Sequence, residues 1–583
     1  MKKLLIFTVV GLLFLTACGN KKDDVSEVGE ENSQFTEYLD ELILEALDPS
    51  DISINFTFID PDKFGIIREP YDLGFTSKED YEEYAADLTN LIDELSEFKD
   101  ADLSLNQQMD RDALIDEFQR SLELSKYYDF EVGTSILGFA RSFMGSVPAY
   151  LEKYEFHDLT DVEGYLNFMD TLAASFQEYV NLEIDRQERG TGYSKAELDE
   201  IVKQAKSLSE AALNNEFYLV EDFNVKLDKT DLDNKDALKK RNQTSLKEGF
   251  SVAFDTIVKG LEGIDADEPK GLAHKPDGKE YYLALLQSNT GSSRTIDEIE
   301  KLVAKHKTTN SIAIQALVKD QPQMESFFEN YTKGPELKQT TGVELIDFLN
   351  SNYDKYFPKT DDFNYELRKV NESMEEGSSP AFYFTPQIDY TDEYKQVIYV
   401  KGDFDPSSYK TYGHESTPGH MYQFTYFLNS ELHPIRNIFT SSANAEGWAK
   451  YSEQYVDRII GMDKDQVEFN RAYDSIVQIL HIEMDIGINY KGWDMAEFSK
   501  FIGENFGIED EAMLDEIYLN FVHNPGAYPT YYLSQLYIED LKKSYFQFHD
   551  DITLDKEFHE AFLKYGSSGF DVIEKGFKKE LKK

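Results

Sequence analysis

The chain has 583 residues, of which 41% are hydrophobic and 14% aromatic, and it carries 111 acidic against 59 basic side chains for a formal net charge of −52. This length exceeds that of one ordinary domain core, and so many large apolar groups exclude a disordered chain. The negative charge repels phosphate backbones, which excludes nucleic acid as an expected partner and favours a role in solubility outside the cytoplasm.

The N-terminus predicts export. Two lysines precede roughly fourteen mostly apolar residues, which are too few to span a bilayer and are typical of a signal peptide. The segment ends in Leu15-Thr16-Ala17-Cys18, which resembles the bacterial lipobox, where the chain is cut before the cysteine and that cysteine is lipidated. Cys18 is the only cysteine, so a disulfide framework is excluded. We expect residues 1–17 to be a lipoprotein signal peptide and Cys18 to anchor the mature protein to the bacterial cell membrane by acyl chains.

Residues 18–34 hold almost no large apolar side chains and predict a flexible tether. From Phe35 onward apolar residues recur at helical spacing, in one stripe from Tyr81 to Phe98 and another from Val162 to Val180. Helix starts are marked by capping boxes, which pair Ser77 with Asp80, Ser194 with Glu197 and Thr295 with Glu298. These patterns predict a helical N-terminal lobe over residues 35–270 and a second lobe over residues 271–583, which carries the HESTPGH stretch.

Two segments rich in β-branched and aromatic residues, 381–386 and 396–404, predict strands. The expected fold is therefore mainly α with a small β-sheet that directly precedes the motif described next. We further expect the strand at 396–404 to pair with an extended peptide as an added strand.

The stretch "HESTPGH", residues 414–420, resembles a zinc-protease helix with an interruption. A hydrolytic zinc site needs three protein ligands, an open position and a nearby carboxylate, and the common motif places two histidines at i and i+4 with a glutamate beside the first. His414 and His420 are six residues apart, which leaves them about 120° apart on a regular helix. Pro418 cannot donate to the His414 carbonyl, and Gly419 supplies backbone freedom. We therefore expect a kink or bulge that restores His420 as a ligand beside His414, with Glu415 as the base.

The segment 441–460, "SSANAEGWAKYSEQYVDRII", predicts a helix that supplies the third ligand. Glu446 falls in its first turn, and Glu453 lies seven residues later on the same face. We predict Glu446 as the ligand and Glu453 as a partner that orients a ligand from behind. The alternative, that both are solvent-exposed helix carboxylates, stays open.

At these residues the sequence resembles DUF885, a family of bacterial proteins that carry H-E-x-x-P-G-H followed by E-G-W-A. Looser similarity covers residues 278–302, "AFYFTP" at 381–386, "DIGINYKGW" at 485–493 and 524–543. The resemblance implies a large, helical, two-lobed, gluzincin-like metallopeptidase fold. It also implies that Zn²⁺ is bound by His414, His420 and Glu446.

The family segment P-G-Q-A-x-x-Y implies that Tyr531 donates to the oxyanion. This chain departs from it with Ala527 and Tyr528, so Tyr528 or His523 are alternatives for that role. Asn489 and His481 stand where the family pattern leads us to expect His and Arg. These departures bear on substrate contacts more than on zinc binding.

The resulting hypothesis is a lipid-anchored, extracytoplasmic, zinc-dependent peptidase. Glu415 takes a proton from water and passes it to the leaving amine, while Tyr531 stabilises the oxyanion of the peptide substrate. One alternative is a non-catalytic surface lipoprotein that binds peptide, glycan or metal, and another is a metal-uptake lipoprotein. Glu415 argues against both alternatives, because metal capture needs no base beside the ligands.

Overall fold

A computed structural model describes residues 31–47, 52–137, 143–214, 217–319, 321–370, 380–387, 389, 395–548 and 554–580. The predicted signal peptide, Cys18 and most of the predicted tether lie outside these residues.

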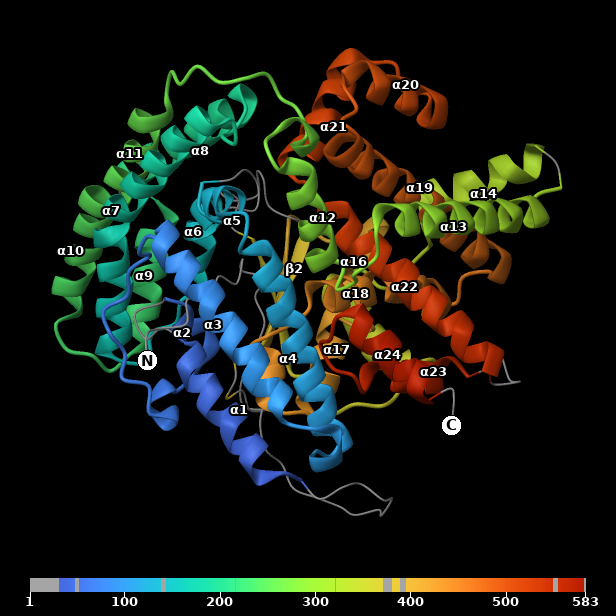
Figure 1. The fold of residues 1–583 in the computed structure, drawn as a ribbon, viewed down its shortest axis with the longest axis horizontal. Helices are drawn as coiled ribbons and strands as arrows, with labels where there is room; N and C mark the ends of the chain where they lie inside the picture. Colours follow the sequence, from blue (N-terminus) through green and yellow to red (C-terminus); the bar gives the residue numbers. More distant parts are fainter. Residues whose placement is uncertain are drawn as a thin grey trace.

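The N-terminal half is a set of helices around one hydrophobic core that runs from Phe35 to Leu261. In Figure 1 its blue-to-green helices fill the left and lower centre of the molecule. The helices are α1 (Ser33–Ala46), α2 (Ser53–Thr57), α3 (Lys78–Glu97), α4 (Leu105–Leu124), α5 (Tyr128–Ser135), α6 (Phe143–Lys153), α7 (Leu159–Arg189), α8 (Lys195–Leu213), α9 (Tyr218–Lys229), α10 (Lys235–Ser245) and α11 (Ser251–Leu261).

Local sequence explains why these helices begin and end where they do. The capping boxes predicted at Ser77, Ser194 and Thr295 are all present, each with its hydroxyl accepting from the amide three residues on. Helix α7 ends at Gly190, whose φ of 74° is left-handed and costs glycine little. The predicted stripes of α3 and α7 face the core.

The C-terminal half packs around a second core, which draws on residues from Leu272 to Phe577 and on Phe130 from the first half. Its yellow-to-red helices occupy the right of Figure 1. They are α12 (Gly278–Asn289), α13 (Ile296–Leu317), α14 (Gln321–Lys333), α15 (Gly342–Asn350), α16 (Tyr409–Glu415), α17 (His420–Leu428), α18 (Ser442–Ile459), α19 (Lys464–Ile486), α20 (Met495–Phe506), α21 (Glu511–His523), α22 (Ala527–Phe548), α23 (Asp555–Leu563) and α24 (Phe570–Glu580). The domain boundary near residue 270 stays a prediction.

The three described strands form one sheet in the order β1-β3-β2. Strands β2 (Ala381–Phe384) and β3 (Gln396–Val400) lie within the predicted segments, and β1 (Tyr365–Lys369) was not predicted. Strand β3 pairs parallel with β1 and antiparallel with β2. The expectation that β3 adds a peptide strand was wrong, because neighbouring strands occupy both of its edges. The prediction of a mainly helical fold with one small sheet is confirmed.

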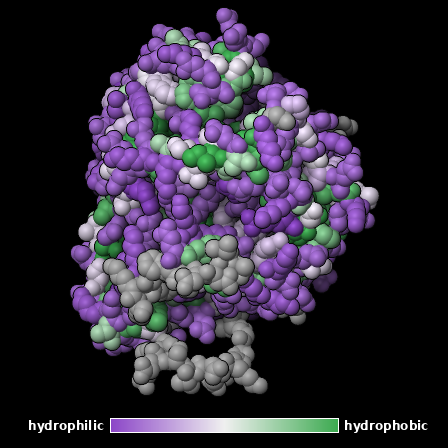
Figure 2. Space-filling view, turned by 90° about the vertical axis from the view of Figure 1, so that its right-hand side faces the viewer, coloured by the Kyte–Doolittle hydropathy of each residue, from purple (hydrophilic) through white to green (hydrophobic). Residues whose placement is uncertain are grey.

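The face of the molecule seen in Figure 2 is mostly hydrophilic, with separate small hydrophobic patches, in keeping with the large net charge. Among the described residues, no helix combines the length and apolar character needed to cross a bilayer.

Candidate metal centre

The HESTPGH motif spans two helices and the turn between them. Helix α16 ends at Glu415 and α17 begins at His420, so the chain breaks where we expected one bulged helix. The turn has its own hydrogen bonds, since the Gly419 amide donates to the Gly413 carbonyl at 3.0 Å. It is also held from outside, because the indole of the buried Trp448 donates to the Pro418 carbonyl at 2.9 Å.

Position 419 requires glycine because the turn leaves no space for a Cβ atom. A Cβ atom built there would lie 1.8 Å from the His414 carbonyl oxygen, far inside van der Waals contact. The Pro-Gly pair therefore ends one helix and lets the backbone double back closely enough for the next to start at His420.

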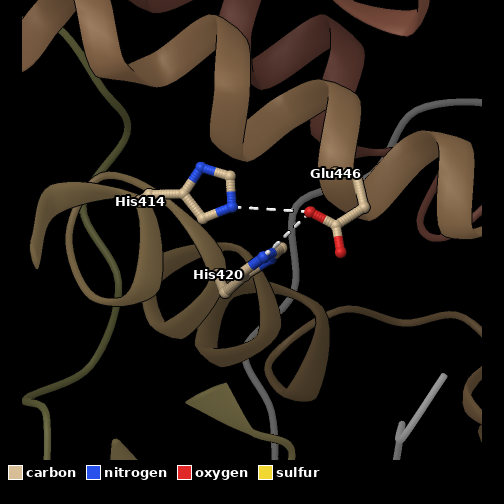
Figure 3. A group of neighbouring side chains, drawn as sticks. All are labelled: His414, His420 and Glu446. Atoms are coloured by element: carbon tan, nitrogen blue, oxygen red, sulfur yellow. Dashed lines mark ion pairs between the residues drawn. The ribbon is translucent and has the colours of Figure 1, made fainter. Parts of the chain in front are cut away.

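This turn brings the three predicted ligands together (Figure 3). The Nε2 atoms of His414 and His420 face the same oxygen of Glu446, Oε2, at 3.4 and 3.5 Å. The two imidazole rings are nearly perpendicular, with centroids 4.8 Å apart. Glu446 lies in the second turn of α18, which crosses beside the motif.

The arrangement fits a zinc ion. Zinc ligands at bond lengths of about 2.0–2.2 Å in a tetrahedron lie roughly 3.4 Å from one another, which matches both nitrogen-to-oxygen separations. Glu446 Oε2 is buried and has no hydrogen-bond partner in the described part of the chain, so a cation would satisfy it. The histidines are each 9% exposed, whereas the Glu446 side chain keeps 26% of its surface accessible. The cluster is thus recessed but open on one side, as a catalytic site needs.

Glu453 occupies the position predicted for it behind His414. Its Oε1 lies 3.0 Å from His414 Nδ1, while its Oε2 accepts from Lys450 Nζ at 2.8 Å. A carboxylate at Nδ1 holds the proton there, which leaves Nε2 free to coordinate and fixes the plane of the ring. Lys450 was not singled out from the sequence, although its spacing of three residues from Glu453 on one helix face is a usable signal.

The electrostatics of the cluster favour a positive charge between its side chains. Burial would lower the pKa of His414, but its contacts with Glu446 and Glu453 raise it to about 10. Burial would raise the pKa of Glu446, but the two imidazoles hold it well below its usual range. Burial likewise opposes the low pKa of Glu453, which Lys450 and His414 bring to about 2. Both carboxylates are therefore ionised and ready to hold a positive charge.

Glu415 lies directly beside the ligands and is 7% exposed. Burial raises its pKa above the usual value, although the positive charge of the two histidines opposes the shift. The backbone amide of Tyr383 donates to its carboxylate, which ties the end of α16 to strand β2. The Tyr383 ring stacks beside His420 with centroids 6.3 Å apart. Tyr383 lies in the quoted AFYFTP segment, but no spacing rule connected it with the histidines.

Of the candidate oxyanion donors, the structure brings Tyr531 to the metal cluster. Its ring stacks near that of His414 with centroids 6.3 Å apart. Tyr528 instead accepts a hydrogen bond from Asn520 at 2.6 Å, and His523 lines a separate cavity. Asn489 is fully buried, accepts from the Leu272 amide and donates to the Phe521 carbonyl, so it links three segments of the fold.

The sequence profile of a family described as "Bacterial protein of unknown function (DUF885)" matches residues 63–576. The chain belongs to this family. No curated protein matches this DUF885 chain.

Two solved structures share the fold of this DUF885 chain. One is described as a "putative lipoprotein" from Colwellia psychrerythraea, with a TM-score of 0.74 and 17% identity over 94% of this chain and 99% of its own. The other is a "putative lipoprotein of unknown function" from Shewanella oneidensis, with a TM-score of 0.58 and 15% identity over the same shares. At these identities the likeness shows the fold alone.

Proposed function

We propose that this protein is a zinc-dependent peptidase. The observation that carries the proposal is the convergence of His414, His420 and Glu446 on one point, with a buried carboxylate, Glu415, adjacent to them. A structural zinc site is closed by four protein ligands and needs no base. Here the described residues offer three ligands, an accessible side and a base.

In the proposed reaction, His414, His420 and Glu446 hold the zinc ion, and Glu453 keeps the His414 ring in its coordinating orientation. When bound, zinc supplies Lewis acidity that polarises the peptide carbonyl and makes water more acidic. Glu415 accepts the proton of the attacking water and later delivers it to the leaving amine, a role suited to a carboxyl whose pKa burial has raised.

Tyr531 is proposed to donate its hydroxyl hydrogen to the developing oxyanion. Support comes from its ring, which lies beside that of a ligand histidine. Strand β2 is the edge strand nearest the site, since Tyr383 contacts both Glu415 and His420. The proposal therefore places the extended substrate along β2 and not along β3.

We place the enzyme outside the cytoplasm, held to the bacterial cell membrane by lipid on Cys18. The lipobox-like segment supports this location, as do the two structural relatives described as lipoproteins.

The test combines metal content with turnover. The mature chain without lipid, residues 19–583, would be purified, its zinc measured, and a mixed peptide library digested and read by mass spectrometry. Wild type would be compared with Glu415→Gln and, as a matched control, with Glu509→Gln on the exposed surface. We expect about one zinc per chain in all three proteins and a loss of cleavage of at least about 100-fold in Glu415→Gln alone.

Failure to bind zinc after it is added back would overturn the metal centre. Zinc binding without cleavage by wild type would favour the alternative of a non-catalytic binding lipoprotein. Equal cleavage by wild type and Glu415→Gln would remove Glu415 as the base.

A further inference from the structure

A cavity of about 620 Å³ lies between the two halves of the chain, apart from the metal cluster. Its walls come from α8 of the N-terminal half and from α19, α20, α21 and the start of α22. Its volume falls within the range of ligand pockets, which is roughly 300–1,000 Å³. It rests on a small separate core formed by α20 and α21.

The most aromatic wall of the cavity surrounds His481. The rings of Tyr528, Phe521 and Phe506 lie 4.8, 6.0 and 6.4 Å from its imidazole, measured between centroids. Met484, Ile502 and Ile517 complete an apolar lining. The surface of this cavity therefore favours a flat apolar group.

Two polar atoms are fixed within this apolar wall. His481 Nδ1 donates to the Val477 carbonyl at 2.8 Å, which leaves Nε2 as an acceptor. The Asn524 amide donates to Asn520 Oδ1, so the Asn520 amide donates to the Tyr528 hydroxyl and leaves that hydroxyl its own hydrogen to give. The cavity wall thus offers one hydrogen-bond acceptor, His481 Nε2, and one donor, the Tyr528 hydroxyl.

The charges around the cavity are acidic. Glu200 and Glu516 line it, and neither lysine nor arginine is among the described residues that do so. A negatively charged ligand would meet repulsion there, and a neutral one would not.

Helix α22 links the cavity to the candidate metal centre, because it carries Tyr528 of the cavity wall and Tyr531 beside His414. Tyr528 and Tyr531 are three residues apart and share one helix face, separated by about 4.5 Å along the axis. Tyr531 lies beside His414, and the Tyr532 ring lies between, 5.8 Å from that of Tyr528. The rings of Tyr531, Tyr532 and Tyr528 thus form a row from His414 to the cavity. An extended peptide would advance about 3.3–3.6 Å per residue along this row.

We propose that this cavity is the specificity pocket of the enzyme and that it binds a neutral aromatic side chain of the peptide substrate. The inference rests on the proposed peptidase function. The His481 imidazole and the Tyr528 ring stack against the aromatic group, and their polar atoms accommodate a phenol hydroxyl where the substrate residue is tyrosine. The chain departs from the family pattern at His481 and Tyr528. In this proposal both residues serve to bind the aromatic side chain.

The test measures peptide binding without turnover. Hexa-alanine and hexa-alanine peptides with Phe or Glu placed at each position in turn would be titrated by calorimetry into the mature chain carrying Glu415→Gln. We expect Phe at one position to tighten binding by about 10- to 100-fold over alanine, because it buries a full aromatic side chain, and Glu to give no gain.

Two further changes in that protein locate the effect. Ala196→Trp fills the cavity from α8 and should reduce the gain in affinity from Phe over alanine to less than about 3-fold. Ser207→Trp, on an exposed position of the same helix, should keep the full gain. His481→Arg should weaken binding of the peptide that carries Phe at the preferred position. It should strengthen binding of the peptide that carries Glu at that same position.

The result that overturns the pocket is the absence of a Phe preference, or a preference that survives Ala196→Trp unchanged. Cleavage of the same peptides by the protein with Glu415 intact separates the two proposals. Cleavage without a Phe preference refutes the pocket and keeps the peptidase, whereas a cavity-dependent Phe preference without cleavage keeps the pocket and refutes the peptidase.

Discussion

The proposed metal ligands are brought together by a turn that requires Gly419, a residue without a side chain. Replacing Gly419 with alanine places a methyl group on the His414 carbonyl, and the turn has to open to relieve the clash. We expect Gly419→Ala to lower the melting temperature and to weaken zinc binding at least about 10-fold, as read by scanning calorimetry and chelator competition. Gly503→Ala is the control, because its nearest neighbour beyond its own helix lies 3.9 Å away. Normal zinc affinity in Gly419→Ala would show that the turn tolerates a side chain.

Glu453, the carboxylate behind His414, is expected to affect how tightly the proposed site binds zinc. Removing Glu453 leaves His414 Nδ1 without its 3.0 Å partner, so the ring loses its fixed orientation. We expect Glu453→Ala to weaken zinc binding by about 10- to 100-fold. Gln454→Ala, the neighbouring position, serves as the control in the same competition assay. Equal affinities in the two variants would mean that Glu453 does not orient the ligand.

The candidate site was predictable from the sequence where its chemistry follows spacing along the chain. His414, Glu415 and His420 were found from the motif, and Glu446 and Glu453 from their positions on one helix face. Tyr531 came only from the family resemblance, because its approach to His414 depends on how α22 packs on α18. Tyr383 was missed for the same reason, since a strand neighbour in space leaves no local pattern.

Helices and strands were predictable where local chemistry decides them. The capping boxes of α3, α8 and α13 and the aromatic strands β2 and β3 were found in this way. Strand β1 was missed because its sequence, YELRK, carries three charged residues and lies half exposed. The two-helix form of the HESTPGH motif was missed because it depends on Trp448, a residue on another helix, binding the Pro418 carbonyl.

Asp485 joins three elements near the cavity. It is fully buried at the end of α19, and it accepts from Tyr282 of α12 at 2.7 Å and from the Gly526 amide before α22 at 3.1 Å. Burial raises the pKa of Asp485 to about 7, although these hydrogen bonds oppose the shift. The folded protein thus binds this proton more tightly than the unfolded chain, in which an aspartate titrates near pH 3.9.

The contribution of Asp485 to stability is therefore full below about pH 4 and is lost as the pH rises through about 7. Relative to Asp485→Asn, wild type should lose about 3 kcal/mol of stability between pH 5 and 8. The measurement is the difference in melting temperature between the two proteins across that range. The exposed Asp515→Asn is the matched control for the loss of one carboxylate. If the difference in melting temperature between wild type and Asp485→Asn stays constant with pH, Asp485 does not bind its proton more tightly in the folded protein than in the unfolded chain.

At the scale of the whole molecule, the two hydrophobic cores exchange segments. Residues 435–439 of the C-terminal half pack in the first core, and Phe130 of the N-terminal half packs in the second. The sequence predicted helical lobes but not this exchange. Apolar periodicity shows which face of a helix is buried, but it does not show which other element covers that face. The cavity depends on how these parts are held together, because α8 of the N-terminal half and α19 to α22 of the C-terminal half both line it.

Arg436 is a buried polar link between the halves. It is 1% exposed and donates to the Tyr565 and Ser567 carbonyls, both at 3.0 Å, while Asp110 of α4 lies 3.4 Å away. Arg436→Met leaves the Asp110 carboxyl buried without its cation, which costs about 3–5 kcal/mol. We expect scanning calorimetry of the metal-free protein to show a lower melting temperature and a split into two transitions, one for each core. Arg458→Met removes the partly exposed pair with Asp555 and should cost less than about 1 kcal/mol. A single transition at the wild-type temperature in Arg436→Met would show that apolar packing alone couples the two halves.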